Sequence, residues 1–382
     1  MLTPLLLIQL LAAIYLLVMK HRIERSLPKL GTNPPSGHES VSAIVPARNE
    51  ENEIEGCIQS LLSQQGVDVE IIVVDDGSAD RTPEIVKKYA GYGVKLVEAT
   101  PPPEGWVGKT WACHLGYEKS GGEWLLFTDS DARMAPNLLS SAISMAREKG
   151  LDMLSLYPRF RMETIALKII LPILLLGLYL IGRPDKVNRG GGAFAFGSFI
   201  LLRRSSYEAF GGHKTVKNAI LEDRALARVA WKNGLKIAMA DARGLMTAAW
   251  NKNFKTLWYG MARIFTPIFL GHKWKPLLFL TAIAYMFLVP VAGILYSLFI
   301  DSSPLIFSIS SYIAVSIATG LESLSHRNRL AGFLLWPLGI LPILASIFLS
   351  WYRSIRDPVI VWRGRLYSLK YGDLHELAEI TY

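Results

Sequence analysis

Cysteine is scarce in this sequence: the 382 residues include only two, Cys57 and Cys113. They form no CxxC pair, and neither has the spacing to other ligands that a zinc site requires. No internal repeat or low-complexity tract is visible either. The sequence therefore argues against a disulfide framework and a cysteine-based metal centre. It predicts two reduced, buried thiols in a cytosolic domain.

Charged residues are also few, at 19% of the chain against 51% hydrophobic residues. This composition is too apolar for an ordinary soluble enzyme and too charged for membrane helices alone, so we expect a soluble domain joined to membrane segments. The formal net charge of +9 would suit nucleic acid, anionic lipid or an anionic substrate. Because many Lys and Arg residues flank apolar runs, the pattern favours the membrane, and we expect no nucleic-acid partner.

The first apolar run covers residues 2–19 and contains no charged residue. At ~1.5 Å of rise per residue, a helix of this length nearly spans a hydrocarbon core of ~30 Å. Basic residues follow the run, at Lys20, Arg22, Arg25 and Lys29. A cleaved signal peptide has its basic residues before the apolar run. The observed order predicts an uncleaved transmembrane anchor over residues 1–20, with the next domain in the cytoplasm.

Three further apolar runs, at about 277–300, 304–322 and 331–350, predict a transmembrane region over residues 277–350. A basic tail follows at 351–382. If the third run crosses the membrane, the arginines of the tail lie outside, against the positive-inside bias. A re-entrant or kinked third segment would keep them inside, and we hold this as a hypothesis.

Residues 164–182 are apolar enough to cross a membrane, yet basic residues flank them on both sides. Basic flanks at both ends place both ends on the same side. We therefore interpret this segment as an interfacial or re-entrant helix that docks the neighbouring domain on the membrane.

Residues 40–255 alternate between β-rich apolar runs and segments with helical periodicity. The expected strands are 41–47, 70–74, 94–98, 124–128, 151–156 and 199–204, and the expected helices are 50–64, 80–90, 109–119 and 136–149. Such alternation predicts an α/β, Rossmann-like domain with a mostly parallel sheet. In these sheets ligands bind beyond the carboxyl ends of the strands.

Acidic motifs follow two of the expected strands. Asp129 and Asp131 are two residues apart, so in an extended chain they share a face and can reach one metal ion. Mg²⁺ or Mn²⁺ prefers carboxylate oxygens, and either ion can stabilise the charge of a departing diphosphate. After the other strand come Asp75 and Asp76. Asp75 could cap the turn or contact a ligand.

Three segments in register carry a family resemblance: VPARNE at 45–50, VVDDGSAD at 73–80 and FTDSDA at 127–132. Together they resemble the family 2 glycosyltransferases, which have the GT-A fold and use nucleotide-sugar donors such as UDP- or GDP-sugars. The resemblance implies donor binding by Pro46, Asn49, Glu50, Asp76 and Asp129, and metal binding by Asp129 and Asp131.

The segment GWVGKTWA at 105–112 resembles the hopanoid-associated and carotenoid (diaponeurosporenoate-type) glycosyltransferases. Lys109 opens a helix there, at the positive end of the helix dipole, which suits a donor phosphate. The resemblance spans nearly the whole chain. The sequence has no clear QxxRW motif, which the processive polysaccharide synthases carry. This puts polymer synthesis in doubt.

The second half of the domain supplies candidates for the acceptor side. Gly191 and Gly192 belong to a loop that can approach a ligand closely, and His213 ends the segment YEAFGGH. In the family, an aspartate at the position of Asp223 is the catalytic general base, and Glu222 is its neighbour. A base on one face of the sugar and the leaving group on the other imply inversion at the anomeric carbon.

These observations predict an inverting, metal-dependent hexosyltransferase in the cell membrane, multi-pass, with its catalytic domain in the cytoplasm. The expected acceptor is a membrane lipid such as a carotenoid, hopanoid or other terpenoid. Three alternatives remain open: a polyprenyl-phosphate glycosyltransferase, a processive polysaccharide synthase, and an inactive membrane protein that binds nucleotide sugars.

Overall fold

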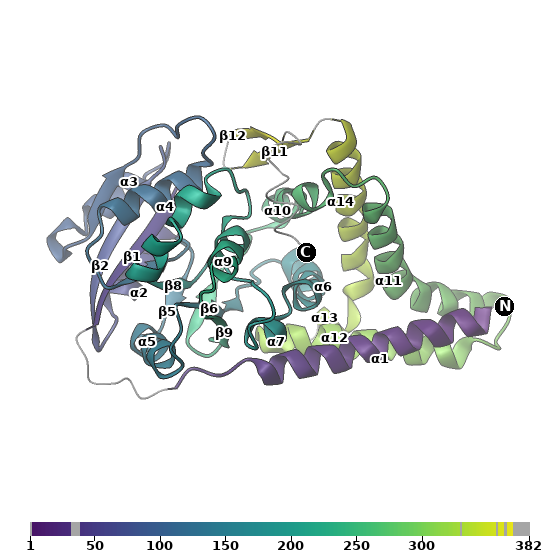
Figure 1. Ribbon diagram of the computed structural model, residues 1–382. Helices are drawn as coiled ribbons and strands as arrows, with labels where there is room; N and C mark the ends of the chain where they lie inside the picture. Colours follow the sequence, from purple (N-terminus) through teal and green to yellow (C-terminus); the bar gives the residue numbers. More distant parts are fainter. Residues whose placement is uncertain (1, 32–38, 329–330, 357, 363–364, 370–382) are drawn as a thin grey trace. The chain divides into compact units, whose positions relative to one another are not determined.

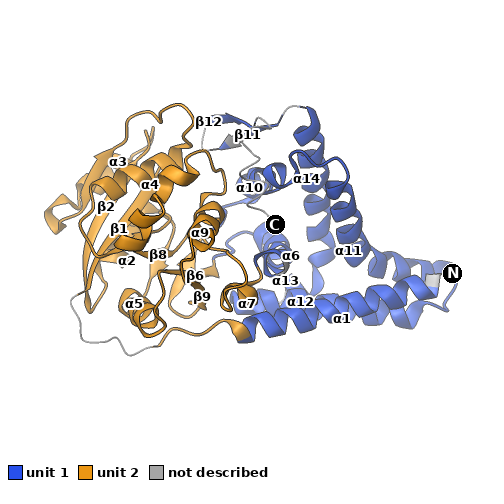
Figure 2. Ribbon diagram, viewed as in Figure 1, with its two compact units in different colours: residues 1–25, 161–182, 250–382 blue, residues 26–160, 183–249 orange. Residues whose placement is uncertain are grey.

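The computed structural model describes residues 2–31, 39–328, 331–356, 358–362 and 365–369. The chain forms two compact units (Figure 2). We call residues 26–160 and 183–249 the α/β unit, and residues 1–25, 161–182 and 250–382 the helical unit. Much of the predicted basic tail, including residues 363, 364 and 370–382, lies outside the described residues.

The α/β unit is built on a seven-stranded sheet in the order β3-β2-β1-β4-β8-β6-β9 (Figure 1). The strands are β1 (Glu39–Ala47), β2 (Val67–Asp75), β3 (Lys95–Glu98), β4 (Trp124–Phe127), β6 (Met153–Tyr157), β8 (Ile200–Arg203) and β9 (Ile237–Asp241). Strands β3, β2, β1 and β4 are parallel, as are β6 and β9, whereas β8 is antiparallel to β4 and β6. The predicted mostly parallel sheet is thus confirmed.

Helices and short elements complete the α/β unit. They are α2 (Ile54–Leu62), α3 (Thr82–Lys87), η1 (Ala90–Tyr92), α4 (Gly108–Glu118), α5 (Leu138–Glu148), α7 (Pro184–Val187), α8 (Arg204–Ala209), η2 (Gly212–Val216) and α9 (Glu222–Lys232). A small second sheet joins β5 (Arg133–Met134), β10 (Met246–Ala248) and β7 (Arg159–Phe160). In α2 the buried residues recur with helical spacing, at Ile54, Cys57, Ile58 and Leu61, so one face of the helix packs on the core.

Helix α4 approaches the sheet unusually closely. A Cβ at Gly116 would lie 2.4 Å from Cγ2 of Ile44 in β1, so only glycine allows this approach. On the same face of the sheet, Ala112 of α4 packs on Ile72 and Val74 of β2. This packing fixes the first turn of α4, where Lys109 lies, relative to the carboxyl ends of β1 and β4.

The helical unit consists of seven helices and a hairpin in the part of the chain that the structure describes. The helices are α1 (Leu2–Ser26), α6 (Ile165–Gly182), α10 (Phe254–Phe269), α11 (Lys275–Phe299), α12 (Leu305–Ser325), α13 (Ala331–Leu334) and α14 (Trp336–Arg356), and the hairpin is β11 (Val359–Trp362) with β12 (Arg365–Ser368). Five helical segments are long and apolar enough to cross a membrane: Thr3–Ser26, Ile165–Val187, Lys275–Phe299, Leu305–Ser325 and Trp336–Arg356.

Helices α1, α11 and α12 pack through small and polar residues. Gln9 of α1 donates a hydrogen bond of 2.8 Å to the carbonyl oxygen of Met286 in α11. A Cβ at Gly293 would clash with Ser308 of α12, so the absence of a side chain lets these two helices approach. Near the last turns of α1 and α12, the ammonium of Lys20 lies 3.2 Å from the carboxylate of Glu322.

After α12 the chain turns back along that helix. Thr319 donates a hydrogen bond of 2.6 Å to the carbonyl of Gly332, and the indole of Trp336 donates one of 2.9 Å to Ser316. Helix α14 therefore begins beside the middle of α12, and its direction crosses that of α1 and α12 (Figure 1). Near its other end, the indole of Trp351 donates to the carbonyl of Lys273, just before α11.

Helix α6 packs inside the helical unit. A Cβ at Gly339 of α14 would lie 2.7 Å from the carbonyl oxygen of Ile169, and Asn328 donates a hydrogen bond of 2.9 Å to the carbonyl of Lys168. The contacts of α6 thus include α14 and the segment after α12. Its interfacial or re-entrant placement stays a prediction.

Candidate active site

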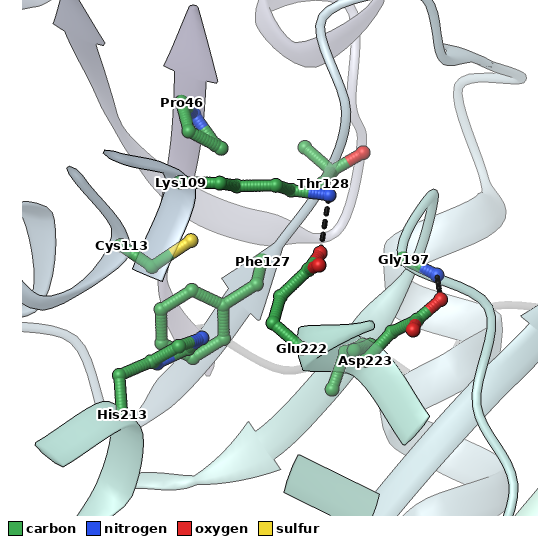
Figure 3. A pocket seen from close by; sticks show the side chains of 10 residues that line it. Pro46, Lys109, Cys113, Phe127, Thr128, Gly197, His213, Glu222 and Asp223 are labelled. Atoms are coloured by element: carbon green, nitrogen blue, oxygen red, sulfur yellow. Dashed lines mark hydrogen bonds and ion pairs between the residues drawn. The ribbon is translucent and has the colours of Figure 1, made fainter. Parts of the chain in front are cut away.

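One pocket of the α/β unit collects residues from both halves of the sequence (Figure 3). It is lined by Pro46, Lys109, Cys113, Phe127, Thr128, Gly197, Ile200, His213, Glu222 and Asp223. The pocket thus combines residues of β1, α4, β4, β8, η2 and α9 with the loops between them.

The ammonium of Lys109 joins two carboxylates in this pocket. Its Nζ lies 2.7 Å from Oδ1 of Asp129 and 2.5 Å from Oε1 of Glu222. Burial lowers the pKa of Lys109, but the two carboxylates raise it by more, so its pKa lies well above the usual range. Lys109 is therefore charged and bridges the loop after β4 to the start of α9.

Glu222 and Asp223 occupy the first turn of α9, where the helix dipole favours negative charge. Burial and the neighbouring Asp223 raise the pKa of Glu222, against the opposing effect of Lys109. Oδ2 of Asp223 accepts a hydrogen bond of 3.0 Å from the backbone nitrogen of Gly197, and Oδ1 accepts one of 2.8 Å from that of Arg224. These two bonds fix the direction of the Asp223 carboxylate.

Gly197 is a site residue that the sequence analysis missed. A Cβ there would lie 3.2 Å from Nζ of Lys109 and 3.4 Å from Oδ2 of Asp223, so the backbone closes tightly over both groups. The sequence analysis singled out only the earlier glycines of this loop. The available signal was a further glycine three residues before the buried strand β8.

His213 forms part of the pocket wall and is only 2% exposed. Its Nδ1 lies 2.8 Å from the hydroxyl of Tyr207, and its ring meets Phe127 edge-on at 4.6 Å between centroids. Burial, and then the charges of His114 and Lys109, lower the pKa of His213 to about 3. The imidazole is therefore neutral at physiological pH and acts as an uncharged wall.

The loop after β2 holds the two neighbouring aspartates in different ways. Asp75 caps the turn, because Oδ2 accepts from the backbone nitrogen of Ser78 at 3.1 Å and Oδ1 accepts from its hydroxyl. Turn capping is one of the two roles that the sequence left open for Asp75. The carbonyl of Asp76 accepts a hydrogen bond from Nη1 of Arg48, which ties the loop after β2 to the loop after β1.

Asn49 and Glu50 strengthen the same connection between loops. Asn49 has a positive φ of 56°, its backbone nitrogen donates to the hydroxyl of Ser78, and its Oδ1 accepts from the nitrogen of Ala79. The backbone nitrogen of Glu50 donates to Thr82 at 2.8 Å, and its side chain is buried. Asn49, Glu50 and Asp76 thus lie at the same sheet edge as the pocket but are not among its lining residues.

The predicted metal ligands follow β4. Asp129 has a side chain that is 36% exposed, and Asp131 comes two residues later in the same loop. Among the described residues, no three or more His, Cys, Asp or Glu side chains form a group that could hold a metal by themselves. Two carboxylates suit Mg²⁺ or Mn²⁺, ions that commonly complete their coordination with substrate phosphates. The donor set therefore fits a metal that arrives with a diphosphate.

The two cysteines behave as the sequence predicts, since both are free and buried. Cys57 lies beneath the acidic loop, with Sγ 3.7 Å from the carbonyl of Asp129, and burial raises its pKa to about 12. Burial also raises the pKa of Cys113 in the pocket wall. Neither thiol is ionised at neutral pH, so neither is poised as a nucleophile or metal ligand.

The glycine-rich loop lies apart from the pocket lining. The backbone nitrogen of Gly191 donates to the carbonyl of Lys186 at 2.9 Å, and the carbonyl of Gly190 accepts from the indole of Trp231 at 2.9 Å. Gly191 and Gly192, predicted on the acceptor side, are not among the lining residues, whereas Gly197 of the same segment is.

Residues 42–211 match the model of the family described as Glycosyl transferase family 2. The chain carries a family 2 glycosyltransferase domain. This match confirms the predicted family for this part of the chain.

Curated relatives of this glycosyltransferase carry a more specific name. The chain is 26% identical over 347 residues to the 4,4'-diaponeurosporenoate glycosyltransferase of Staphylococcus aureus strain USA300, covering 87% of this chain and 89% of the relative. It is 25% identical over 348 residues to the protein of the same name from the bovine strain RF122 / ET3-1, with the same coverage. The similarity therefore includes most of the helical unit as well as the glycosyltransferase domain.

A solved structure supports the fold of the glycosyltransferase. The mannosyltransferase PcManGT of Pyrobaculum calidifontis, in complex with GDP-Man and Mn²⁺, matches with a TM-score of 0.55 at 17% identity. The match covers 93% of this chain and 99% of the mannosyltransferase. The predicted GT-A fold is thus confirmed.

Proposed function

We propose that this glycosyltransferase transfers one sugar from a nucleotide-sugar donor to a membrane lipid, with inversion at the anomeric carbon. The observation that carries the proposal is the bridge made by Lys109. It joins Asp129, a candidate donor-side acid, to Glu222 at the start of α9, next to the candidate base Asp223. One pocket thereby brings together groups for the leaving diphosphate and for the attacking oxygen.

On the donor side, the end of β1 and the connected loops after β1 and β2 would bind the nucleoside through Pro46, Asn49, Glu50 and Asp76. Lys109, in the first turn of α4, would contact the diphosphate. Mg²⁺ or Mn²⁺, bound between Asp129, Asp131 and the donor, would stabilise the negative charge of the leaving diphosphate. The name of the mannosyltransferase complex, with GDP-Man and Mn²⁺, supports a donor and metal of this kind.

On the acceptor side, we assign Asp223 as general base. With its direction fixed by Gly197 and Arg224, it would take the proton of an acceptor hydroxyl. The acceptor oxygen then bonds to the anomeric carbon from one face. The bond to the diphosphate oxygen breaks on the opposite face, and the nucleoside diphosphate leaves. The product has the inverted configuration, and Asp223 has gained one proton.

A lipid acceptor is supported by two independent facts. The curated relatives are named 4,4'-diaponeurosporenoate glycosyltransferase, and the ending -oate denotes a carboxylate. The helical unit contains five segments that are long and apolar enough to cross a membrane. We infer that the acceptor carries its hydroxyl or carboxylate at one end of a terpenoid-like chain.

The arrangement of the helical unit supports a single cytoplasmic side for its basic ends. Helix α14 starts beside the middle of α12, and its last turns lie next to the segment before α11. The chain would thus enter the membrane region after α12 and return to the same side. The basic ends then share that side: Lys20 and Arg25 on α1, Lys273 and Lys275 before and at the start of α11, Arg327 after α12, and Arg353 and Arg356 on α14.

The deciding experiment is Asp223→Asn in the full-length protein, assayed with UDP- and GDP-sugars and two apolar acceptors, one with a hydroxyl and one with a carboxylate. We expect donor affinity to stay and transfer to the hydroxyl to fall by about 10²–10⁴-fold, the usual contribution of a general base. A carboxylate acceptor carries no proton at neutral pH and should be affected less. Asp68→Asn, at an exposed position, is the matched control. Full transfer to the hydroxyl by the Asp223 variant would refute the assignment of the base.

A further inference from the structure

The pocket contains more negative than positive charge. Glu222 and Asp223 line it, and Asp129 meets Lys109 at its edge. Among the described lining residues, Lys109 carries the only positive charge, since His213 is neutral. The ammonium of Lys109 therefore balances part of the negative charge of the carboxylates around it.

The position of the Lys109 ammonium conflicts with that of a metal on Asp129. Nζ lies 2.7 Å from Oδ1 of Asp129, which is the distance of a direct charge-assisted hydrogen bond. A divalent cation on the same oxygen would lie within a few ångströms of the ammonium, where two positive charges repel strongly. The ammonium and the metal are therefore competitors for this oxygen.

The surroundings allow Lys109 to leave Asp129 without losing all its partners. Its second contact is to Oε1 of Glu222, 2.5 Å away on helix α9 (Figure 3). The backbone of Gly197 closes over the ammonium, so the side chain has little room on that side. If the Lys109 side chain moves away from Asp129, its ammonium can keep the ion pair with Glu222. Another N–H group of the ammonium can then donate a hydrogen bond to a phosphate oxygen.

We propose that Lys109 is a positioning residue that couples metal binding to donor binding. Without donor it occupies Asp129 and weakens the binding of a bare metal ion. When metal and donor arrive together, it leaves Asp129 for the diphosphate and keeps its contact with Glu222. This inference rests on the proposed metal-assisted transfer. It adds that the metal ion replaces the Lys109 ammonium at Asp129 when the donor binds.

The proposal predicts effects of opposite sign for one substitution. Lys109→Met removes the competing ammonium, so Mn²⁺ alone should bind about fivefold more tightly, as expected from one partly buried ion pair. The same substitution removes a phosphate contact, so Mn²⁺ with UDP or GDP should bind about tenfold more weakly. A lysine that only contacts phosphate gives the second effect without the first.

Binding can be measured on the full-length protein in detergent, by electron paramagnetic resonance of free Mn²⁺ and by calorimetry with UDP or GDP. Lys109→Arg keeps the charge and should leave the binding of Mn²⁺ alone weak. Lys119→Ala, at the exposed end of the same helix, is the matched control and should change neither affinity. If loss of Lys109 alone impairs folding by leaving Glu222 unpaired, Lys109→Met combined with Glu222→Gln removes that charge and tests the same point.

Each outcome decides a separate question. Unchanged or weaker binding of Mn²⁺ alone in Lys109→Met overturns the proposed competition, while Asp129→Asn and Asp131→Asn can still show that a metal site exists. If neither aspartate variant changes Mn²⁺ binding with or without nucleotide, the metal assignment in the proposed function fails instead.

Discussion

The backbone nitrogen of Gly197 donates a hydrogen bond of 3.0 Å to Oδ2 of Asp223, and the same glycine leaves no room for a side chain beside Lys109. One residue thus fixes the candidate base and limits the movement of the candidate phosphate ligand. Because the constraint comes from backbone position, it depends on glycine at this position and not on any functional group.

Gly197→Ala tests this constraint. The added methyl would lie 3.2 Å from Nζ of Lys109, which must give way by a few tenths of an ångström, and 3.4 Å from Oδ2 of Asp223, which leaves that carboxylate in van der Waals contact with it. We expect kcat to fall by about 10²-fold, because small misplacements of catalytic groups have effects of this size. Gly121→Ala, where a Cβ meets nothing within 4 Å, should behave as wild type. Equal kinetic constants for the two variants would show that Gly197 does not position the base.

The pocket also makes a prediction about acid stability. The pKa of His213 is lowered from an ordinary value of 6.5 to about 3, so below pH 6.5 the unfolded chain binds a proton that the folded chain does not. The stability that depends on neutral His213 is present above pH 6.5 and is lost as the pH falls toward 3. The loss for one such group reaches about 1.4 kcal/mol per pH unit.

Thermal unfolding between pH 7 and pH 4, followed for wild type and for His213→Gln, measures this contribution. The variant should start less stable at pH 7, because the bond to Tyr207 is altered, and should lose less stability on acidification. His272→Gln is the control. His272 lies in a loop and is only partly buried, whereas His213 is buried in the pocket wall. Parallel pH profiles for wild type and the His213 variant would show that His213 titrates normally.

These residues show what the sequence could predict. The alternation of β-rich and helical runs predicted the order of the longer strands and helices through β6, because each run has its own period, but it did not predict the short elements η1 and β5. The sequence also placed Lys109, Asp129, Glu222 and Asp223 in one family pattern, and these four meet in the structure. It left open whether Asp75 caps a turn, since that depends on the loop geometry that hydrogen-bonds Ser78.

Other features depend on contacts between distant segments and could not be read from local patterns. Strand β8 was expected as a strand, but its antiparallel position between β4 and β6 arises from long-range pairing. Gly197 has no functional group, so only the space around it reveals its importance. His213 was placed on the acceptor side by its motif, and only its burial shows that the ring is neutral.

The buried ion pair of the helical unit makes a prediction about stability. Lys20, 3% exposed, lies 3.2 Å from Glu322, which is fully buried and also 3.0 Å from His326. Lys20→Met should destabilise this unit by about 3–5 kcal/mol, because it leaves a buried carboxylate without its ammonium. Combining it with Glu322→Gln should recover much of that loss. Thermal unfolding in detergent checks both, and a double variant less stable than Lys20→Met would contradict the pairing.

The course of α14 makes a prediction about the side of the membrane on which the hairpin β11–β12 lies. Because α14 starts beside the middle of α12 and its last turns lie next to Lys273, the hairpin β11–β12 should lie on the same side as the start of α11. The turn between α11 and α12 should lie on the opposite side. The two native cysteines are buried, so a single introduced cysteine can report its own accessibility.

Ser303→Cys, in the turn between α11 and α12, should react with a membrane-impermeant maleimide in intact cells. Ser368→Cys, at the end of β12, should react only after permeabilisation. Both positions are exposed, so differences in reactivity report the side of the membrane and not burial. Labelling of Ser368→Cys in intact cells would mean that α14 crosses the membrane. The arginines at its end would then face outward, against the positive-inside bias.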